Sequence, residues 1–169
     1  NWTTVDEYKQ SMASKAPDQV FYATSELAAS PLISAFQARG LEVLVSKHPI
    51  DVAVMARLEE RLRPLKFSRI DSSDLDLLHD PSREKEILDS DMRTEGAKLA
   101  SFFKNCLGDD EQLEVVAKSL LSDDISGYYA TSDEKRRLND YMRLLAPEQK
   151  APAVDDRTFV INTNNPLVN

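Results

Sequence analysis

One stretch of the chain, residues 20–47, restricts the possible folds more than any other part. It opens with the β-prone run Val-Phe-Tyr, and the later pair Ser30-Pro31 predicts a helix start, because proline is well tolerated directly after a serine cap. Gly40 predicts the end of that helix, since glycine adopts the left-handed conformation at low cost. Residues 41–45, Leu-Glu-Val-Leu-Val, are typical of a strand that is buried on both faces of a parallel sheet. The stretch therefore predicts a right-handed strand–helix–strand crossover.

Helix and strand signals continue on both sides of this crossover. The sequence Thr-x-x-Glu at residues 4–7 is a capping box, which predicts a helix start. Asp51 can cap a further helix that ends at Pro64, and residues 65–70 alternate between apolar and polar, as in a strand with one wet face. The fold class that we expect is α/β, with a small three-layer α/β/α domain built on a mostly parallel sheet and a second, α+β domain after it.

An acidic segment at residues 71–83 separates the two expected domains. It is interrupted by Pro81 and has no sustained hydrophobic period, so we interpret it as a surface loop or linker. We place the first domain at residues 1–80 and the second at residues 81–169.

The second expected domain begins with helical periodicity from Glu84 to Gly108. Residues 113–117 and 125–129 are predicted to be strands, and the short link between them favours a hairpin. Residues 158–161 form the last predicted strand. Four residues of the helix form an apolar stripe that we expect to face a core: Leu99, Phe102, Phe103 and Cys106.

A second capping box at residues 131–134 predicts another helix with one apolar face. Two interpretations of that face stay open. It packs in a core, or it is a partly exposed surface that binds unfolded chains, because methionine adapts to irregular partners. The basic run at residues 135–137 is interpreted as the wet face of the same helix. The apolar face carries, at i, i+3, i+4 and i+7 spacing, Leu138, Tyr141, Met142 and Leu145.

Composition excludes several function classes. The chain has 21 Lys and Arg against 29 Asp and Glu, and its net charge of −8 argues against a nucleic-acid partner. No window approaches the roughly 20 apolar residues that a membrane-spanning helix needs. One cysteine excludes an internal disulfide and a multi-cysteine zinc site. We therefore expect a cytoplasmic protein without a membrane partner, and we interpret the chain, which lacks an initiator Met and a signal peptide, as a fragment of a longer protein.

No motif of catalysis, cofactor binding or metal binding stands out. The first turn after a strand, residues 24–26, lacks the glycines that a phosphate-binding loop needs. His48 and His79 lie in expected loops, and Cys106 is interpreted as a small core residue rather than a nucleophile. The paired carboxylates at residues 109–111, 123–124 and 155–156 lack calcium-loop spacing. We expect no catalytic, cofactor-binding or metal-binding residue in this chain.

The order of several short motifs resembles the Hsp90 chaperone family, in particular its bacterial HtpG-type members. Each motif is weak by itself, but their order and spacing match along nearly the whole chain. Thr163 and Asn165 depart from the family's usual Pro and His. The matching segments are Thr4-Val5-Asp6-Glu7-Tyr8 with Met12, the strand Val20–Tyr22, Ser30-Pro31, Gly40–Leu44, Ile50-Asp51 and Asn162–Val168.

The resemblance implies what the two domains are. Residues 1–80 correspond to the C-terminal α/β part of the family's middle domain, and residues 81–169 to the first part of its C-terminal domain, without the dimerisation helices. The family's ATP site lies outside this chain. The resemblance thus implies a stress-response chaperone segment that is not itself an enzyme and holds no cofactor, whereas the full-length protein would be a homodimer that binds ATP and Mg and hydrolyses the ATP.

The resemblance also implies a role in protein folding through unfolded or partly folded client proteins. It assigns client binding to Leu138, Tyr141 and Met142, and it assigns to the segment the coupling of the ATP-driven clamp motion to the dimer interface. Val52 and Ala53 replace an acidic–aromatic pair that contacts clients in some members. The alternative function is that of a flavodoxin-like metabolite-binding or enzymatic α/β domain.

Overall fold

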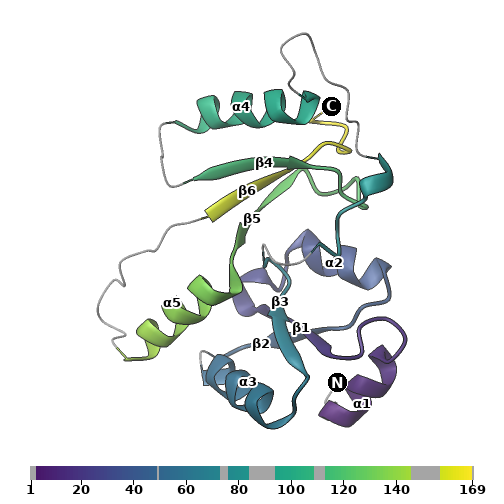
Figure 1. Ribbon diagram of the computed structural model, residues 1–169, viewed down its shortest axis with the longest axis vertical. Helices are drawn as coiled ribbons and strands as arrows, with labels where there is room; N and C mark the ends of the chain where they lie inside the picture. The colour runs from purple at the N-terminus through teal and green to yellow at the C-terminus, as the bar shows by residue number, and fades with distance from the viewer. Residues whose placement is uncertain are drawn as a thin grey trace. The chain divides into compact units, whose positions relative to one another are not determined.

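The computed structural model describes residues 3–48, 50–72, 76–83, 94–108, 113–145 and 157–168 (Figure 1). The chain divides into two compact units. Unit 1 comprises Asn1–Ser72 and Asp133–Ala153, and unit 2 comprises Ser73–Ser132 and Val154–Asn169. Each unit contains its own three-stranded sheet, and the α/β class expected from the sequence is confirmed.

The first helix of unit 1, α1 (Val5–Met12), begins where the capping box predicts. The Thr4 hydroxyl accepts a hydrogen bond from the Glu7 backbone N–H at 3.2 Å, and the Glu7 carboxylate accepts one from the Thr4 N–H at 2.8 Å. Two backbone donors at the helix start are thereby satisfied. Tyr8 and Met12 lie on the buried face of α1.

The sheet of unit 1 is entirely parallel and has the order β2-β1-β3. Its strands are β1 (Gln19–Thr24), β2 (Val43–Ser46) and β3 (Lys66–Arg69). The central strand, β1, is almost wholly buried, whereas β2 lies at an edge and Val45 is exposed. The expectation that residues 41–45 are buried on both faces is therefore wrong, because Leu41 is buried but the face of β2 that carries Val45 is left uncovered.

Helices cover both faces of this sheet. Successive residues of a strand point to opposite sides, so neighbouring residues of β1 contact different helices. Phe21 of β1 packs edge-on against Phe36 of α2 (Pro31–Ala38), with ring centroids 5.2 Å apart. Tyr22 points to the other face, where it lies near α3 (Ile50–Arg61). Before α2, residues Ser25–Leu27 form the short 3-10 helix η1. Ser30 caps α2, and Gly40 after it has a φ of +68°, as its predicted stop position requires.

The sheet of unit 2 has the order β4-β6-β5 (Figure 1). Strand β6 (Arg157–Asn162) runs between β4 (Glu114–Lys118), to which it is parallel, and β5 (Gly127–Thr131), to which it is antiparallel. The predicted hairpin of the first two strands is therefore wrong: β6, from the end of the chain, pairs between them.

The helix that precedes this sheet is α4 (Glu95–Leu107), capped by Thr94 and preceded by the 3-10 helix η2 (Pro81–Arg83). None of its residues is buried. Phe102 and Cys106 are exposed, which contradicts the expected core-facing stripe and the interpretation of Cys106 as a core residue. The predicted helical residues 84–93 lie outside the described residues.

Helix α5 (Asp133–Leu145) follows β5 in the chain but groups with unit 1, where it contacts α3. The sequence interpretation assigned this helix to the second domain, and the division at residue 80 stays a prediction. Within the described residues, none of the helices is long and apolar enough to cross a membrane.

Candidate functional site

Four apolar residues of α5 are exposed, whereas Arg136 and Arg137 of the same helix are directed toward the rest of unit 1. Of the two open interpretations of this face, the structure favours the exposed surface over the core. Arg136, by contrast, is only 3 % exposed, so the interpretation of residues 135–137 as a uniformly wet face is wrong. The exposed fractions are 54 % for Leu138, 59 % for Tyr141, 42 % for Met142 and 65 % for Leu145.

Arg136 is buried against the central strand of unit 1. Its guanidinium donates a hydrogen bond to the Tyr22 hydroxyl and pairs with Asp133 in the first turn of α5. The guanidinium carbon also lies 5.4 Å from the centroid of the Tyr22 ring, within the range of a cation–π contact. Burial raises the pKa of Tyr22, and the nearby Arg136 charge opposes that shift, so the phenol stays protonated at neutral pH.

Arg137 joins α5 to two other elements of unit 1. Its guanidinium forms a two-pronged contact with the Glu59 carboxylate of α3, with one N–O distance of 2.8 Å, and donates to the Phe67 carbonyl of β3 at 2.9 Å. The same carboxylate accepts the Phe67 backbone N–H. Burial would raise the pKa of Glu59, but the hydrogen bonds from Arg137 and Phe67 outweigh it and hold the pKa below its ordinary value.

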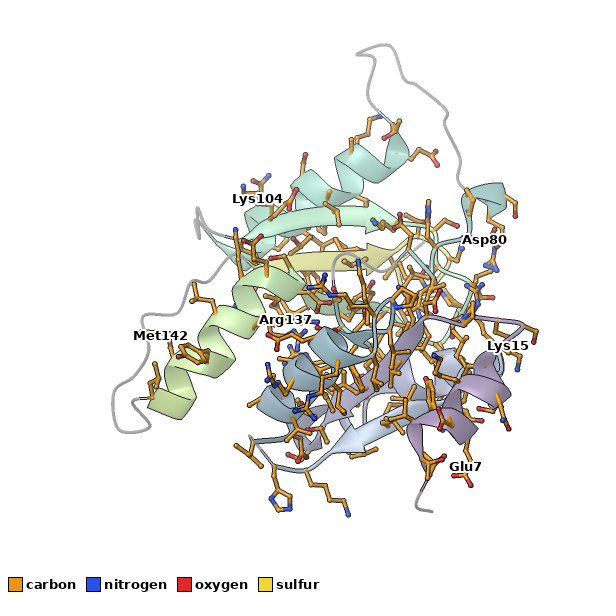
Figure 2. The ribbon with its side chains drawn as sticks, turned by 60° about the horizontal axis from the view of Figure 1, so that its bottom comes forward. Glu7, Lys15, Asp80, Lys104, Arg137 and Met142 are labelled. Atoms are coloured by element: carbon orange, nitrogen blue, oxygen red, sulfur yellow. The ribbon has the colours of Figure 1, made fainter. Side chains whose placement is uncertain are left out.

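A small apolar pocket of about 100 Å³ lies between α3 and α5 over the sheet of unit 1. In Figure 2 the Arg137 side chain points inward from α5, whereas Met142 lies on its outward side. Exposed Ile50 and Val54 add apolar surface on α3. The pocket is lined by Tyr22, Val52, Ala53, Met55, Ala56, Phe67, Arg137 and Tyr141. We call this pocket, together with the exposed residues Leu138, Tyr141, Met142 and Leu145, the α3/α5 surface.

Comparison with known proteins gives a consistent result along the whole chain. The sequence model of the Hsp90 protein family matches residues 1–169. The chain belongs to the Hsp90 family. It is 24 % identical to the chaperone protein HtpG of Chlorobium phaeovibrioides, an alignment that covers 99 % of this chain and 29 % of that protein. It is 28 % identical to the chaperone protein HtpG of Mycolicibacterium vanbaalenii, and that alignment covers 98 % of this chain and 26 % of that protein. It is 25 % identical to the chaperone protein HtpG of Chlorobium chlorochromatii, where the alignment covers 99 % of this chain and 26 % of that protein.

This Hsp90-family chain spans less than a third of the length of those relatives. Of the three residues to which the resemblance assigns client binding, Tyr141 lines the pocket, while Leu138 and Met142 lie on the exposed face beside it. Val52 and Ala53 form part of the pocket wall. Sequence reasoning missed Arg136, Arg137 and Glu59, because the contacts that join α5 to β1, α3 and β3 are made between residues 70 or more positions apart in the chain.

At the carboxyl edge of the first sheet of this Hsp90-family chain, Asp51 is hydrogen-bonded to the turn that follows β2. The Asp51 carboxylate accepts hydrogen bonds from the Ser46 hydroxyl at 3.2 Å and from the Lys47 and His48 N–H groups at 3.1 and 3.0 Å. Asp51 thus holds the turn before α3. Among the described residues, no group of three or more side chains could hold a metal ion, and the carboxylates at 109–111 and 155–156 lie outside them.

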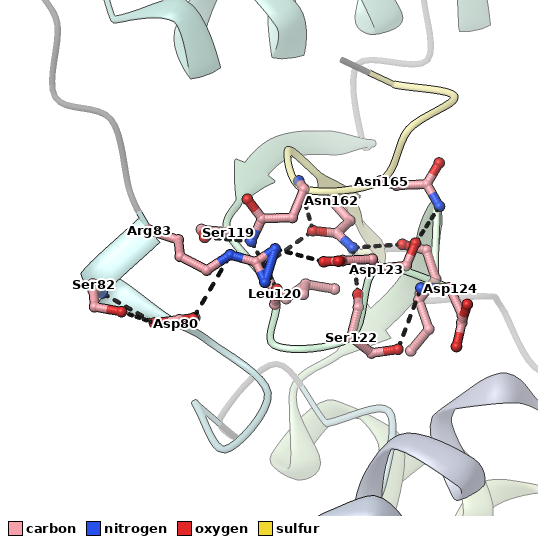
Figure 3. Close-up of polar contacts among 12 residues, drawn as sticks. Asp80, Ser82, Arg83, Ser119, Leu120, Ser122, Asp123, Asp124, Asn162 and Asn165 are labelled. Carbon is pink, nitrogen blue, oxygen red and sulfur yellow. Dashed lines mark hydrogen bonds and ion pairs between the residues drawn. The ribbon is translucent and has the colours of Figure 1, made fainter.

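A second polar cluster connects the loops of unit 2 (Figure 3). Asn162, at the end of β6, is fully buried and hydrogen-bonds through its side chain to four backbone groups. Asp123 pairs with Arg83, and its carbonyl accepts a hydrogen bond from the Asn165 side chain at 2.7 Å. The Asn-rich segment that resembles the family motif therefore has a structural role in this unit.

Proposed function

We propose that this chain is a segment of an Hsp90-type molecular chaperone and that its α3/α5 surface binds unfolded or partly folded client proteins. The family match supports the chaperone class. The binding role is supported mainly by one observation: α5 exposes four apolar side chains while Arg136 of the same helix is buried. The exposed side chains are Leu138, Tyr141, Met142 and Leu145.

The chemistry of this surface suits partners without a fixed shape. A contiguous exposed apolar patch is unusual on a soluble protein and commonly marks a binding surface. Met142 can repack around different partners, because its side chain is unbranched and has a polarizable sulfur. The pocket of about 100 Å³ has room for a small part of a client side chain, with Tyr22 and Phe67 available for apolar contact. Clients with exposed leucine, phenylalanine or similar side chains are therefore the expected partners.

The wider role extends beyond the residues of this chain. We propose that the full-length protein is a homodimeric, ATP-hydrolysing chaperone of the cytoplasm whose ATP and Mg sites lie outside this segment. The segment itself would then have no enzymatic activity and would transmit the clamp motion toward the dimer interface. The alternative of a metabolite-binding α/β domain is less favoured, because the family match supports a chaperone and Asp51 is occupied by backbone donors.

The test replaces Leu138 and Met142 together by serine in the 169-residue chain. Burying one exposed leucine or methionine is worth about 1.5–3 kcal/mol when complete. Since each side chain is already about half buried, the double variant should lose about 2 kcal/mol, or more than tenfold in affinity. The probe is reduced, carboxymethylated α-lactalbumin carrying a fluorophore, and binding is followed by fluorescence anisotropy.

The matched control is Leu167→Ser, which removes an even more exposed leucine from unit 2. This control should keep the affinity of the unchanged chain, and circular dichroism should show the same helix content in all variants. An unchanged dissociation constant in the double variant would remove the basis of the proposal.

A further inference from the structure

We propose that Arg136 and Arg137 are positioning residues that dock α5 onto unit 1 with its apolar face outward and thereby form the pocket beside that face. The proposal rests on the client-binding function above and concerns what holds the binding surface in place.

The buried side chain that the structure describes on α5 is charged rather than apolar. Among the side chains of α5 that the structure describes, Arg136 is the buried one, and the large apolar residues are all exposed. An amphipathic helix normally docks through its apolar face. In α5, by contrast, Arg136 and Arg137 face unit 1, so polar contacts are a main part of the docking that the structure describes.

The two arginines contact three different elements of unit 1. Arg136 donates to the Tyr22 hydroxyl of β1, and Arg137 contacts Glu59 of α3 and the Phe67 carbonyl of β3. A guanidinium is suited to this task, because its planar group of five N–H donors can bind a carboxylate and a carbonyl at the same time. Glu59 is only 17 % exposed in its side chain, so its pair with Arg137 is partly shielded from solvent.

The pocket depends on this docking. Arg137 and Tyr141 are the two α5 residues that line it, and at i, i+4 spacing they lie next to each other on the helix surface. Without the arginine contacts, the pocket would lose the whole of its α5 wall. The client-binding residues would still be present in the chain, but they would no longer lie beside the pocket. Loss of an arginine should therefore weaken client binding even though neither arginine belongs to the exposed apolar face.

The experiment measures hydrogen exchange of the α5 amides and affinity for the labelled α-lactalbumin probe in the same variants. In Arg137→Ala, and in the Arg136→Ala, Arg137→Ala double variant, we expect α5 to exchange at least tenfold faster and probe affinity to fall about tenfold. Amides of β1 should keep their rates. Arg137→Lys keeps the charge but not the planar donor group, so it should give an intermediate change.

The control is Arg57→Ala, which removes an arginine of α3 whose ion pair with Glu60 is exposed on both sides. It should change neither measurement. Unchanged α5 exchange in Arg137→Ala would overturn the proposal, as would faster exchange with unchanged probe affinity. If the double variant does not fold, Arg137→Ala and Arg137→Lys decide the question, because Arg137 is partly exposed.

The same data separate this proposal from the proposed function. The serine substitutions at Leu138 and Met142 should weaken probe binding without changing α5 exchange. If they leave binding unchanged, or if the unchanged chain does not bind the probe, the client-binding function fails while the exchange rates still show whether the arginines dock α5.

Discussion

Replacing Asn162 by alanine should destabilise unit 2 strongly, since this one buried side chain connects the loop at residues 120–125 to the turn that follows β6. Its amide oxygen accepts hydrogen bonds from the Leu120 and Asn164 N–H groups, both at 3.0 Å. Its amide nitrogen donates to the Ser122 and Ile125 carbonyls, both at 2.7 Å. The side chain thereby uses its full hydrogen-bonding capacity in the interior (Figure 3).

The size of the effect follows from which partners lose access to water. The contacts to Leu120 and Ile125 are buried, and the other two are partly buried. A buried group left without a partner costs about 1–3 kcal/mol. Counting the two buried groups at about 2 kcal/mol each gives a loss of about 4 kcal/mol, a large part of the stability of a small unit.

Urea unfolding followed by hydrogen exchange of the β4 and β6 amides measures this loss for unit 2 separately from unit 1. Asn162→Asp should also be destabilised at neutral pH, because a carboxylate cannot donate to the Ser122 and Ile125 carbonyls. The control is Asn105→Ala on the exposed surface of α4, which should stay within about 0.5 kcal/mol of the unchanged chain. A loss below about 1 kcal/mol in Asn162→Ala would mean that the hydrogen bonds of this side chain do not stabilise unit 2 as described.

Two further predictions concern single groups. Because the folded-state pKa of Glu59 is lowered, its contribution to α5 docking is present above its ordinary pKa near 4.5 and is lost as the pH falls through the folded value. Exchange of the α5 amides should accelerate in that acidic range, and Glu59→Gln should remove much of this dependence. Gly127→Ala would place its Cβ 2.8 Å from the Val160 carbonyl and should cost about 1–3 kcal/mol in thermal unfolding. In Gly96→Ala the new Cβ meets only an ordinary 3.5 Å contact inside a helix, so that variant should be neutral or more stable; equal losses in both would contradict this account.

Local interactions explain which parts of the fold could be predicted from the sequence. The starts of α1 and α2 and the stop at Gly40 depend on hydrogen bonds and backbone conformations within a few residues, and all three were predicted correctly. The expected β4–β5 hairpin is wrong. Strand pairing depends on residues far apart in the chain, and β6 takes the central position between β4 and β5. The expected burial of β2 was also wrong, because the exposure of Val45 depends on which distant elements cover that face of the strand.

The orientation of α5 likewise depends on residues that are far away in the sequence. Periodicity correctly placed Leu138 and Met142 on one face of a helix, but it cannot say whether that face or the opposite one is docked. The outcome depends on Glu59, 78 positions from Arg137, and on Tyr22, 114 positions from Arg136. Such distant partners leave no local pattern. In α4, similarly, the periodicity marked an apolar stripe correctly, whereas the expected burial of Phe102 and Cys106 did not follow.

Site-specific photo-crosslinking can show directly whether α5 contacts a client protein. A photoreactive benzoylphenylalanine at position 142 places the reactive group on the exposed face of α5, and the same residue at position 167 is the control on an exposed site of unit 2. If the α3/α5 surface binds clients, the labelled α-lactalbumin probe should be captured from position 142 and much less from position 167, and an excess of unlabelled probe should compete for this capture. Equal capture from both positions, or none from position 142, would contradict the assignment of client binding to the α3/α5 surface.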